Sequence, residues 1–350
     1  MRRGRGHTPI GIDVGSRQIK AVQLNRSSKG DQIRAAAILP RRGDNKPFDG
    51  EEAAQLSEML ARQGFDGRKI VLAAAAEQVM TEILELPPRN SGAPIEEIAR
   101  AEMARSQRCD FNSFEMALWD LPAPARAAEG SCVMAATGPH AQSDHILDLF
   151  EAEGWEVITI DIHPWAMARS CAAAYGISTD MIAALDLGAR HSLFVLIYQG
   201  VVVYDRSLND VGIAPLHDAL KSRLDLDEEM TDHILRKVGF GAEVNEQSDQ
   251  DHTSSAIHSM VSEHVDRLIE ELQVSLSYAA QQYPKAGIGR LALLGGGAAI
   301  PGITHYIDEA LDVDVMALTP CDMVKCPSPL RAKCETPALT MAIGLAQYHA

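Results

Sequence analysis

A short turn near the start of the chain carries the residue types that bind phosphate and magnesium. It joins two apolar runs and contains Asp13-Val-Gly15-Ser16-Arg17, with Lys20 shortly afterwards. The glycine allows a sharp turn, and backbone N–H groups with a lysine nearby form a common cradle for phosphate. Asp13 could hold Mg²⁺ through water, because Mg²⁺ prefers oxygen ligands and keeps much of its hydration shell. The turn is therefore a candidate phosphate site.

The same arrangement recurs half a chain length later, at Asp186-Leu-Gly188. Self-similarity at this spacing indicates two related domains, and two such turns facing each other would clamp a nucleotide from both sides. In the alternative interpretation, both are ordinary hairpins whose aspartate caps the turn. Apolar runs predict three strands around each turn: 10–14, 19–24 and 32–39 in the first copy, and 181–187, 192–198 and 201–204 in the second.

A third motif follows in the second half. An apolar run, 291–294, leads into Gly295-Gly296-Gly297 and then into a predicted helix. Glycines remove side chains where a flat ring or a phosphate must approach the backbone, and a helix N-terminus adds a positive dipole. The three motifs in this order predict a nucleotide site between two domains.

These motifs resemble the two phosphate loops and the adenosine loop of the actin-like ATPase superfamily. The resemblance implies an α/β, actin-like (ribonuclease H-like) fold that binds ATP or ADP with Mg²⁺, the metal lying at Asp13 and Asp186 and held through water. It implies these cofactor-binding residues: Asp13, Gly15, Ser16, Arg17, Lys20, Asp186, Gly188, Ser192, Gly212, Asp232, Arg236, Gly295, Gly296 and Gly297. Asp232 and Arg236 have a second interpretation as an exposed helical pair, because they are spaced i,i+4.

Within the superfamily, the chain resembles the family of the type IV pilus assembly protein PilM and, more distantly, the cell-division protein FtsA. The resemblance spans residues 9–348 and rests on Leu86-Pro87-Pro88, the predicted helix 94–105, the run 160–169 and the ending 342–346. Both relatives carry an extra subdomain at this point of the chain. FtsA also has a C-terminal amphipathic membrane helix, which this sequence lacks, so PilM is the better match.

The expected domain organisation follows. The first actin-like domain covers residues 1–178 and includes a small α+β insert subdomain at 87–154. The second covers 179–350 and includes a helical subdomain at 225–289. A polar run at 244–255 is predicted to be a loop, followed by a long amphipathic helix.

Catalysis is the weakest part of the resemblance. In the superfamily, the residue that polarises the attacking water lies near the start of one helix. In this sequence the corresponding helix is predicted to begin at His163-Pro164, and Asp161 and His163 are the local candidates for that role. The alternative is that Asp161 ends a strand and His163 caps the helix. Many relatives have Gly-Gly where Val211-Gly212 stands, and the valine adds bulk near the expected nucleotide. ATP hydrolysis therefore stays open, and at most a slow ATPase is expected.

Composition limits the classes of partner that the chain is expected to bind. The chain has 350 residues, which suggests about two domains, and a formal net charge of −16, which disfavours nucleic acid and anionic membranes. No apolar run reaches the length of a membrane span, and the basic start 1–5 is not followed by the apolar stretch of a signal peptide. Cys321, Cys326 and Cys334 lack the paired spacing of a zinc site and predict a loop with reduced thiols.

The functional expectation is an ATP-binding scaffold of a type IV pilus-like assembly machine. The resemblance implies that it binds the cytoplasmic N-terminal peptide of a PilN-like inner-membrane protein in a groove by the insert, and that nucleotide state modulates this interaction. The chain would then be cytoplasmic, at the inner face of the membrane through its partner, and its self-association is open. Alternatives are an FtsA-like polymerising ATPase, a GspL-like secretion scaffold and, from another class, a small-molecule kinase.

Overall fold

The first sheet is built from the first repeat and two later strands. A computed structural model describes residues 6–28, 30–43, 46–122, 131–237, 239 and 249–349. The strand order is β1-β3-β2-β5-β9, with β4 paired to β3. The β2–β3–β4 hairpins are antiparallel, whereas β5 and β9 run parallel to β2. The bounds are β1 Gly6–His7, β2 Ile10–Val14, β3 Gln18–Arg26, β4 Gln32–Pro40, β5 Lys69–Ala73 and β9 Glu156–Asp161.

The second sheet repeats this plan, with the order β12-β11-β10-β13-β14. Three antiparallel strands again come first, and two parallel strands follow. The six predicted strands of the two repeats are thus confirmed. The bounds are β10 Met181–Leu187, β11 Ser192–Tyr198, β12 Val201–Ser207, β13 Ile288–Leu294 and β14 Asp314–Ala317.

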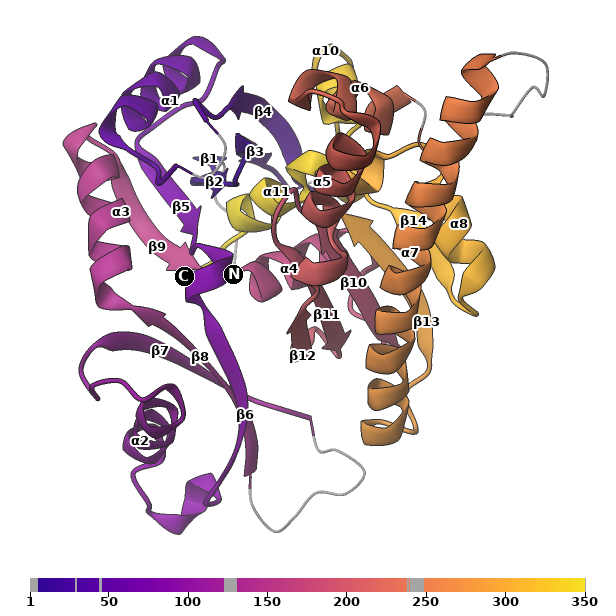
Figure 1. Cartoon of the computed structure of the whole chain (residues 1–350). Coiled ribbons are helices and arrows are strands. Elements are labelled where there is room, and N and C mark those ends of the chain that lie inside the picture. The colour runs from indigo at the N-terminus through magenta and orange to yellow at the C-terminus, as the bar shows by residue number, and fades with distance from the viewer. Residues whose placement is uncertain are drawn as a thin grey trace.

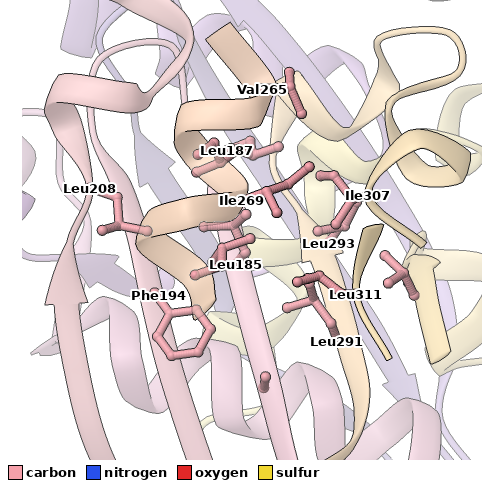
Figure 2. Packing of buried hydrophobic residues seen from close by; sticks show 14 of the residues in the cluster. Leu185, Leu187, Phe194, Leu208, Val265, Ile269, Leu291, Leu293, Ile307 and Leu311 are labelled. Atoms are coloured by element: carbon pink, nitrogen blue, oxygen red, sulfur yellow. The ribbon is translucent and has the colours of Figure 1, made fainter. Parts of the chain in front are cut away.

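Helices cover the outer face of each sheet (Figure 1). On the first, α1 (Gly50–Arg62) and α3 (His140–Ala152) pack over buried Ile10, Ile12 and Ile70. On the second, the long helix α7 (Asp249–Gln282) lies over β10, β11 and β13. Figure 2 shows Val265 and Ile269 of α7 packed against Leu185, Leu187 and Phe194 of the sheet. Burial of these alternating apolar side chains is the main stabilising term for both domains.

Two helices fill the space between the sheets: α4 (His163–Tyr175) and α11 (Thr340–Ala346). One apolar cluster there contains side chains of both sheets together with those of the two helices. Contact is so close that two glycines are required: a Cβ on Gly11 would lie 2.2 Å from Ala342 O, and one on Gly344 would lie 2.1 Å from Ala166 O. The two domains therefore share a packed interior beneath the facing turns.

The insert is a separate small sheet, with the order β6-β8-β7, covered on one face by α2 (Ile95–Gln107). Its strands are β6 Met80–Leu86, β7 Phe114–Asp120 and β8 Ser131–Pro139. The sheet begins at Met80, before the predicted boundary at residue 87. The Pro87-Pro88 pair follows the end of β6, and β6 is itself a strand of the insert. At the other end, Phe150 of α3 packs in the core of the first sheet, so that helix is not part of the insert's own core.

The remaining elements connect these units. The prediction of a loop at 244–255 is wrong from residue 249 onward, because α7 already begins at Asp249. Residues 244–248, like the start 1–5 and the predicted loop segment 123–130, lie outside the described residues. The other helices are α5 Ile213–Leu224, α6 Glu228–Lys237, α8 Ile303–Ala310, α9 Pro320–Met323 and α10 Ser328–Cys334. The short 3₁₀ helices are η1 Ala76–Gln78, η2 Arg89–Ser91, η3 Asn209–Val211, η4 Gly296–Ala299 and η5 Pro337–Leu339.

Candidate nucleotide site

The two acidic turns meet in one place. Asp13 lies opposite Lys20 in the register of β2 and β3, and Lys20 Nζ donates a hydrogen bond to Asp13 Oδ2 at 2.9 Å. Ser16 and Arg17 form the bend between these strands. Asp186, at the corresponding point of β10, lies near enough for the charges of Asp13 and Lys20 to act on its carboxyl group. The two turns therefore lie close together, as a shared phosphate site requires.

The electrostatics of this cluster leave it short of positive charge. Burial, and then the charge of Asp13, raise the pKa of Asp186 to about 7, while Lys20 acts in the opposite direction. Burial alone would lower the pKa of Lys20, but the charge and hydrogen bond of Asp13 outweigh it and raise that pKa. Two carboxylates thus share one ammonium group. A divalent cation would relieve this imbalance, because its charge favours both carboxylates in their ionised form.

The carboxylates do not form a complete metal cage. Within the described part of the chain, no group of three or more His, Cys, Asp or Glu side chains is placed to hold a metal ion. Asp13 and Asp186 could therefore hold Mg²⁺ only if phosphate oxygens and water complete its octahedral shell. Mg²⁺ is usually bound in this way at phosphate sites. The donor set fits the predicted role of the two aspartates.

The second turn leaves one hydroxyl without a partner. Gly188 is required there, because a Cβ on it would lie 2.4 Å from His191 O. Ser192 Oγ is buried and has no hydrogen-bond partner among the described residues. Gly212 lies against the same hydroxyl, since a Cβ on Gly212 would be 2.4 Å from Ser192 Oγ. A buried hydroxyl without a partner is costly, and a phosphate oxygen would satisfy it.

His264 was not identified from the sequence as a residue that positions the Val211-Gly212 turn. His264 of α7 is buried, with Nε2 lying 2.7 Å from Gly212 O and 3.0 Å from Val211 O. Burial lowers the pKa of His264, so the ring is neutral and its Nε2–H donates to these carbonyl groups. Arg267 lies 3.4 Å from Nδ1, which suits that tautomer. The available signal was a histidine inside the apolar stripe of α7.

The bulk of Val211 was expected to crowd the nucleotide. Its side chain instead packs against the apolar cluster of the second domain. The turn that carries Val211 and Gly212 is therefore anchored on two sides, by this packing and by His264.

Arg17 reaches across to the second domain. Its Nη1 donates to Asp232 Oδ1 at 2.7 Å and its Nη2 donates to Glu228 Oε1 at 2.7 Å, both on α6. His217 of α5 lies 3.3 Å from Nη2. Two predicted cofactor residues, Arg17 and Asp232, are thus brought together, but as partners of each other. Sequence reasoning missed Glu228 and His217, whose proximity to Arg17 depends on how the two domains pack.

Arg236 differs from these residues. Its side chain is 70% exposed, its Nε donates to the backbone oxygen of Asp232 at 3.0 Å and its Nη2 lies 4.0 Å from the Asp232 carboxylate. These contacts stay within one helix. They correspond to the alternative interpretation of Arg236 as a member of an exposed i,i+4 pair.

The three glycines have three different surroundings. Gly295 has φ +79° and lies against the second acidic turn, since a Cβ on Gly295 would be 2.2 Å from Asp186 Oδ1. Gly297 abuts Ile213, and Gly296 is exposed with nothing within 4 Å of a Cβ position. The expected α-helix does not follow at once: η4 comes first, and α8 begins only after Pro301-Gly302. A flat ring could therefore lie over Gly296, and the helix start that adjoins the motif is that of α5, whose first residue Ile213 contacts Gly297.

The two catalytic candidates have different environments. The Asp161 carboxylate accepts hydrogen bonds from Arg169 and, at 2.8 Å, from the Ile162 N–H. These contacts hold the start of α4 in place. His163 is largely but not fully buried, at 14% side-chain exposure, with Nε2 3.9 Å from Asp13 Oδ1 and with Nδ1 lacking a partner among the described residues. Burial lowers its pKa, so the ring is neutral and could orient water. Of the two, only His163 adjoins the acidic turns.

The cysteines lie away from this cluster. Cys321 and Cys326 line a cavity of about 560 Å³ together with Asp31 and Arg331. All six cysteines are free thiols, and burial raises the pKa of Cys321 to about 12. A thiol with such a pKa is a weak nucleophile at neutral pH. This region contributes nothing to the candidate nucleotide site.

Comparison with known proteins identifies the fold. A family model described as type IV pilus assembly protein PilM matches residues 11–349. The chain is similar to a solved PilM-PilN type IV pilus biogenesis complex (TM-score 0.75, 20% identity, 98% of each chain). It is also similar to the ethanolamine utilization protein EutJ from Carboxydothermus hydrogenoformans (TM-score 0.54, 14% identity, 99% of this chain and 91% of that one). A third similar structure is MreB 5 of Spiroplasma citri bound to AMPPNP (TM-score 0.51, 14% identity, 96% and 93%). These likenesses confirm the predicted actin-like fold.

The helices were also compared with the requirements of a bilayer. Across the described ranges, none is both long and apolar enough to cross a membrane.

Proposed function

The chain belongs to the family of the type IV pilus assembly protein PilM, and from that premise we propose that it is a nucleotide-binding scaffold of a pilus-type assembly machine. It binds ATP or ADP with Mg²⁺ between its domains and, through the insert, the cytoplasmic N-terminal peptide of a PilN-like inner-membrane protein. The observation that carries the nucleotide part is the convergence of Asp13, Lys20 and Asp186 beside the partnerless Ser192 hydroxyl. The solved complex of a similar chain with PilN supports the partner.

Different residues of the site would bind the phosphates and the metal. Lys20 and the Ser192 hydroxyl would contact phosphate oxygens, and Asp13 and Asp186 would hold Mg²⁺ through water. The metal supplies charge neutralisation for the phosphates. The neutral ring of His163 adjoins Asp13 and is the group placed to orient water, which would give at most a slow hydrolysis. Binding, with occupancy as the signal, is the function that the geometry supports best.

The insert offers the surface for a peptide. Strands β6 and β7 flank β8, and the three form one sheet. An extended peptide can add to a sheet edge through main-chain hydrogen bonds, while side-chain pockets give specificity. Apolar side chains are exposed on the insert at Met80 (54%), Ile83 (39%) and Phe111 (41%). These residues suit a short apolar peptide better than a charged one.

Nucleotide binding at this site is tested by thermal unfolding. With Mg-ATP or Mg-ADP at about a hundred times the dissociation constant, the wild-type protein should gain about 2.7 kcal/mol of stability. The Asp13→Ala variant should lose this gain, because it removes both the acidic group and the partner of Lys20. Asp312→Ala, which removes an exposed acidic side chain far from the site, is the matched control. An equal gain in wild type and Asp13→Ala would refute the site.

The contacts of Arg17 predict a gain of affinity. Glu228→Gln should lower the dissociation constant of Mg-ATP about two- to fivefold, because half-exposed ion pairs contribute up to about 1 kcal/mol and the substitution weakens the hold of α6 on Arg17, which then keeps Asp232 as its carboxylate partner. Glu229→Gln makes the same charge change at the neighbouring exposed position of α6 and should have little effect. Titration calorimetry measures both variants. Equal changes in the two would indicate long-range charge alone.

A polymerising role is the second candidate. Sedimentation with and without Mg-ATP separates it from the scaffold: the scaffold should stay in the supernatant, whereas an FtsA-like ATPase should pellet.

A further inference from the structure

The insert belongs to the first domain by chain connection but also contacts the second. It lies between β5 and β9 of the first sheet in sequence. Yet Thr81 Oγ1 of β6 donates a hydrogen bond to Asp205 Oδ2 of β12 at 2.8 Å, and Trp119 Nε1 of β7 donates to Val202 O of β12 at 2.8 Å. The insert therefore bridges the two domains.

These contacts come from one face of the insert. The register aligns Thr81 with Ala136 and Met134 with Trp119, so their side chains lie on the face opposite α2. Met134 and Ala136 are almost fully buried, at 2% and 3% exposure. The Trp119 ring also meets Trp165 of α4 edge-on, with 5.4 Å between the ring centroids. Part of this face is thus packed against neighbouring elements, whereas Ile83, which pairs with Met134 on the same face, stays 39% exposed.

The contact between Thr81 and Asp205 keeps a carboxylate partly out of water. Burial raises the pKa of Asp205, and the hydroxyl of Thr81 only partly offsets that effect. An ionised carboxylate at this position, with the neutral Thr81 hydroxyl as its donor, has a higher free energy than in water, because water would solvate its charge better. Separation of the insert would lose one hydrogen bond and return the carboxylate to water. A small displacement of β12 can therefore decide whether the contact is made.

The second acidic turn can produce such a displacement. Asp205 pairs with Val195 of β11, the strand that begins at Ser192, so a shift of that turn moves β12 with it. The turn also touches the approach to β6 directly, because His191 Nε2 lies 3.2 Å from Glu77 Oε2 in η1. Two contacts thus connect the region of the candidate phosphate turn with β6 and with the 3₁₀ turn η1 that leads into it.

We propose that β6 is the element through which nucleotide at the second acidic turn controls the docking of the insert on the second domain, with Thr81–Asp205 and Glu77–His191 as the carrying contacts. This inference rests on the proposed function, because it needs a nucleotide at that turn. It names two sites, the candidate nucleotide site and the insert, and the contacts that would join them, and its two states would be the insert docked on β12 and the insert released. The observed structure, in which the insert contacts β12, is the docked arrangement.

Hydrogen exchange of the β6 amides tests this in the whole protein, with Mg-AMPPNP as the probe. In the wild-type protein, exchange across residues 80–86 should change when Mg-AMPPNP is added. Thr81→Val keeps the shape of the side chain but removes its hydroxyl. It should speed exchange of this segment about fivefold without nucleotide, as expected for one lost hydrogen bond, and should abolish most of the nucleotide response. Glu77→Gln should reduce the response through the other contact. Thr304→Val, on α8, is the control.

The outcomes separate the inference from the function on which it rests. A nucleotide-induced thermal shift in Thr81→Val, together with loss of the response in 80–86, supports the coupling. A normal thermal shift with unchanged exchange of 80–86 in the wild-type protein overturns the inference and leaves nucleotide binding intact. A wild-type response that persists in both Thr81→Val and Glu77→Gln overturns the carrying contacts. No thermal shift in the wild-type protein overturns both the inference and the proposed nucleotide site.

Discussion

Gly344→Ala is expected to unfold most of the protein or to lower its free energy of unfolding by about 3 kcal/mol or more. The added Cβ would lie 2.1 Å from Ala166 O and 2.7 Å from Ser170 Oγ. The first of these is a backbone atom of α4, so the clash cannot be relieved by rotating a side chain. Overpacking of a tight interior costs typically 1–3 kcal/mol and more when the backbone must shift. Urea denaturation followed by circular dichroism measures the loss.

A matched control lies in the glycine motif. Gly296→Ala should change stability by less than about 0.5 kcal/mol, as surface substitutions usually do, because nothing lies within 4 Å of the new Cβ. If Gly344→Ala proves as stable as Gly296→Ala, the close approach of α11 to α4 is wrong.

Asp186→Asn is expected to stabilise the nucleotide-free protein at alkaline pH. The pKa of Asp186 is raised from 3.8 to about 7, chiefly by burial and then by Asp13. Its protonated form is the one that the fold favours, so its stabilising contribution is complete below about pH 4 and is lost as the pH rises through about 7. At pH 8 the amide should be more stable than the carboxylate by on the order of 2–4 kcal/mol, since each pKa unit corresponds to about 1.4 kcal/mol.

The measurement compares urea denaturation at pH 5 and pH 8 without Mg²⁺ or nucleotide. The advantage of Asp186→Asn should shrink at pH 5, and the same variant should lose its response to Mg-ATP. A pH-independent difference from wild type would contradict a strained carboxylate at this position. Asp13→Asn provides contrast, because it removes the ion pair with Lys20 and should destabilise the protein.

Local patterns predicted the fold well. The two acidic turns lie between apolar runs that suit adjacent strands, so each hairpin and its repeat could be located from sequence. The resemblance then supplied the actin-like arrangement. The boundary of the insert was missed because Pro87-Pro88 looks like a domain border, and only the pairing of β6 with β8 shows that the strand before it belongs to the insert.

The site was predicted where one turn carries its chemistry and missed where packing supplies it. Asp13 and Lys20 are neighbours in the chain and remain together in the structure. His264 and Glu228 come from helices far away in sequence, and their positions depend on how those helices pack. Asp161 was a catalytic candidate because of its place before α4, and in the structure Arg169 holds its carboxylate. For His264, its place inside the apolar stripe of α7 was the available local signal.

The contact between Gly11 and α11 has a consequence for biosynthesis. Strand β2 emerges from the ribosome among the earliest segments, yet the surface around Gly11 is covered by residues 342–346, which are translated more than three hundred codons later. A nascent chain therefore carries an uncovered apolar strand through most of its synthesis. Molecular chaperones that recognise such strands would be expected to engage this chain until translation passes residue 346.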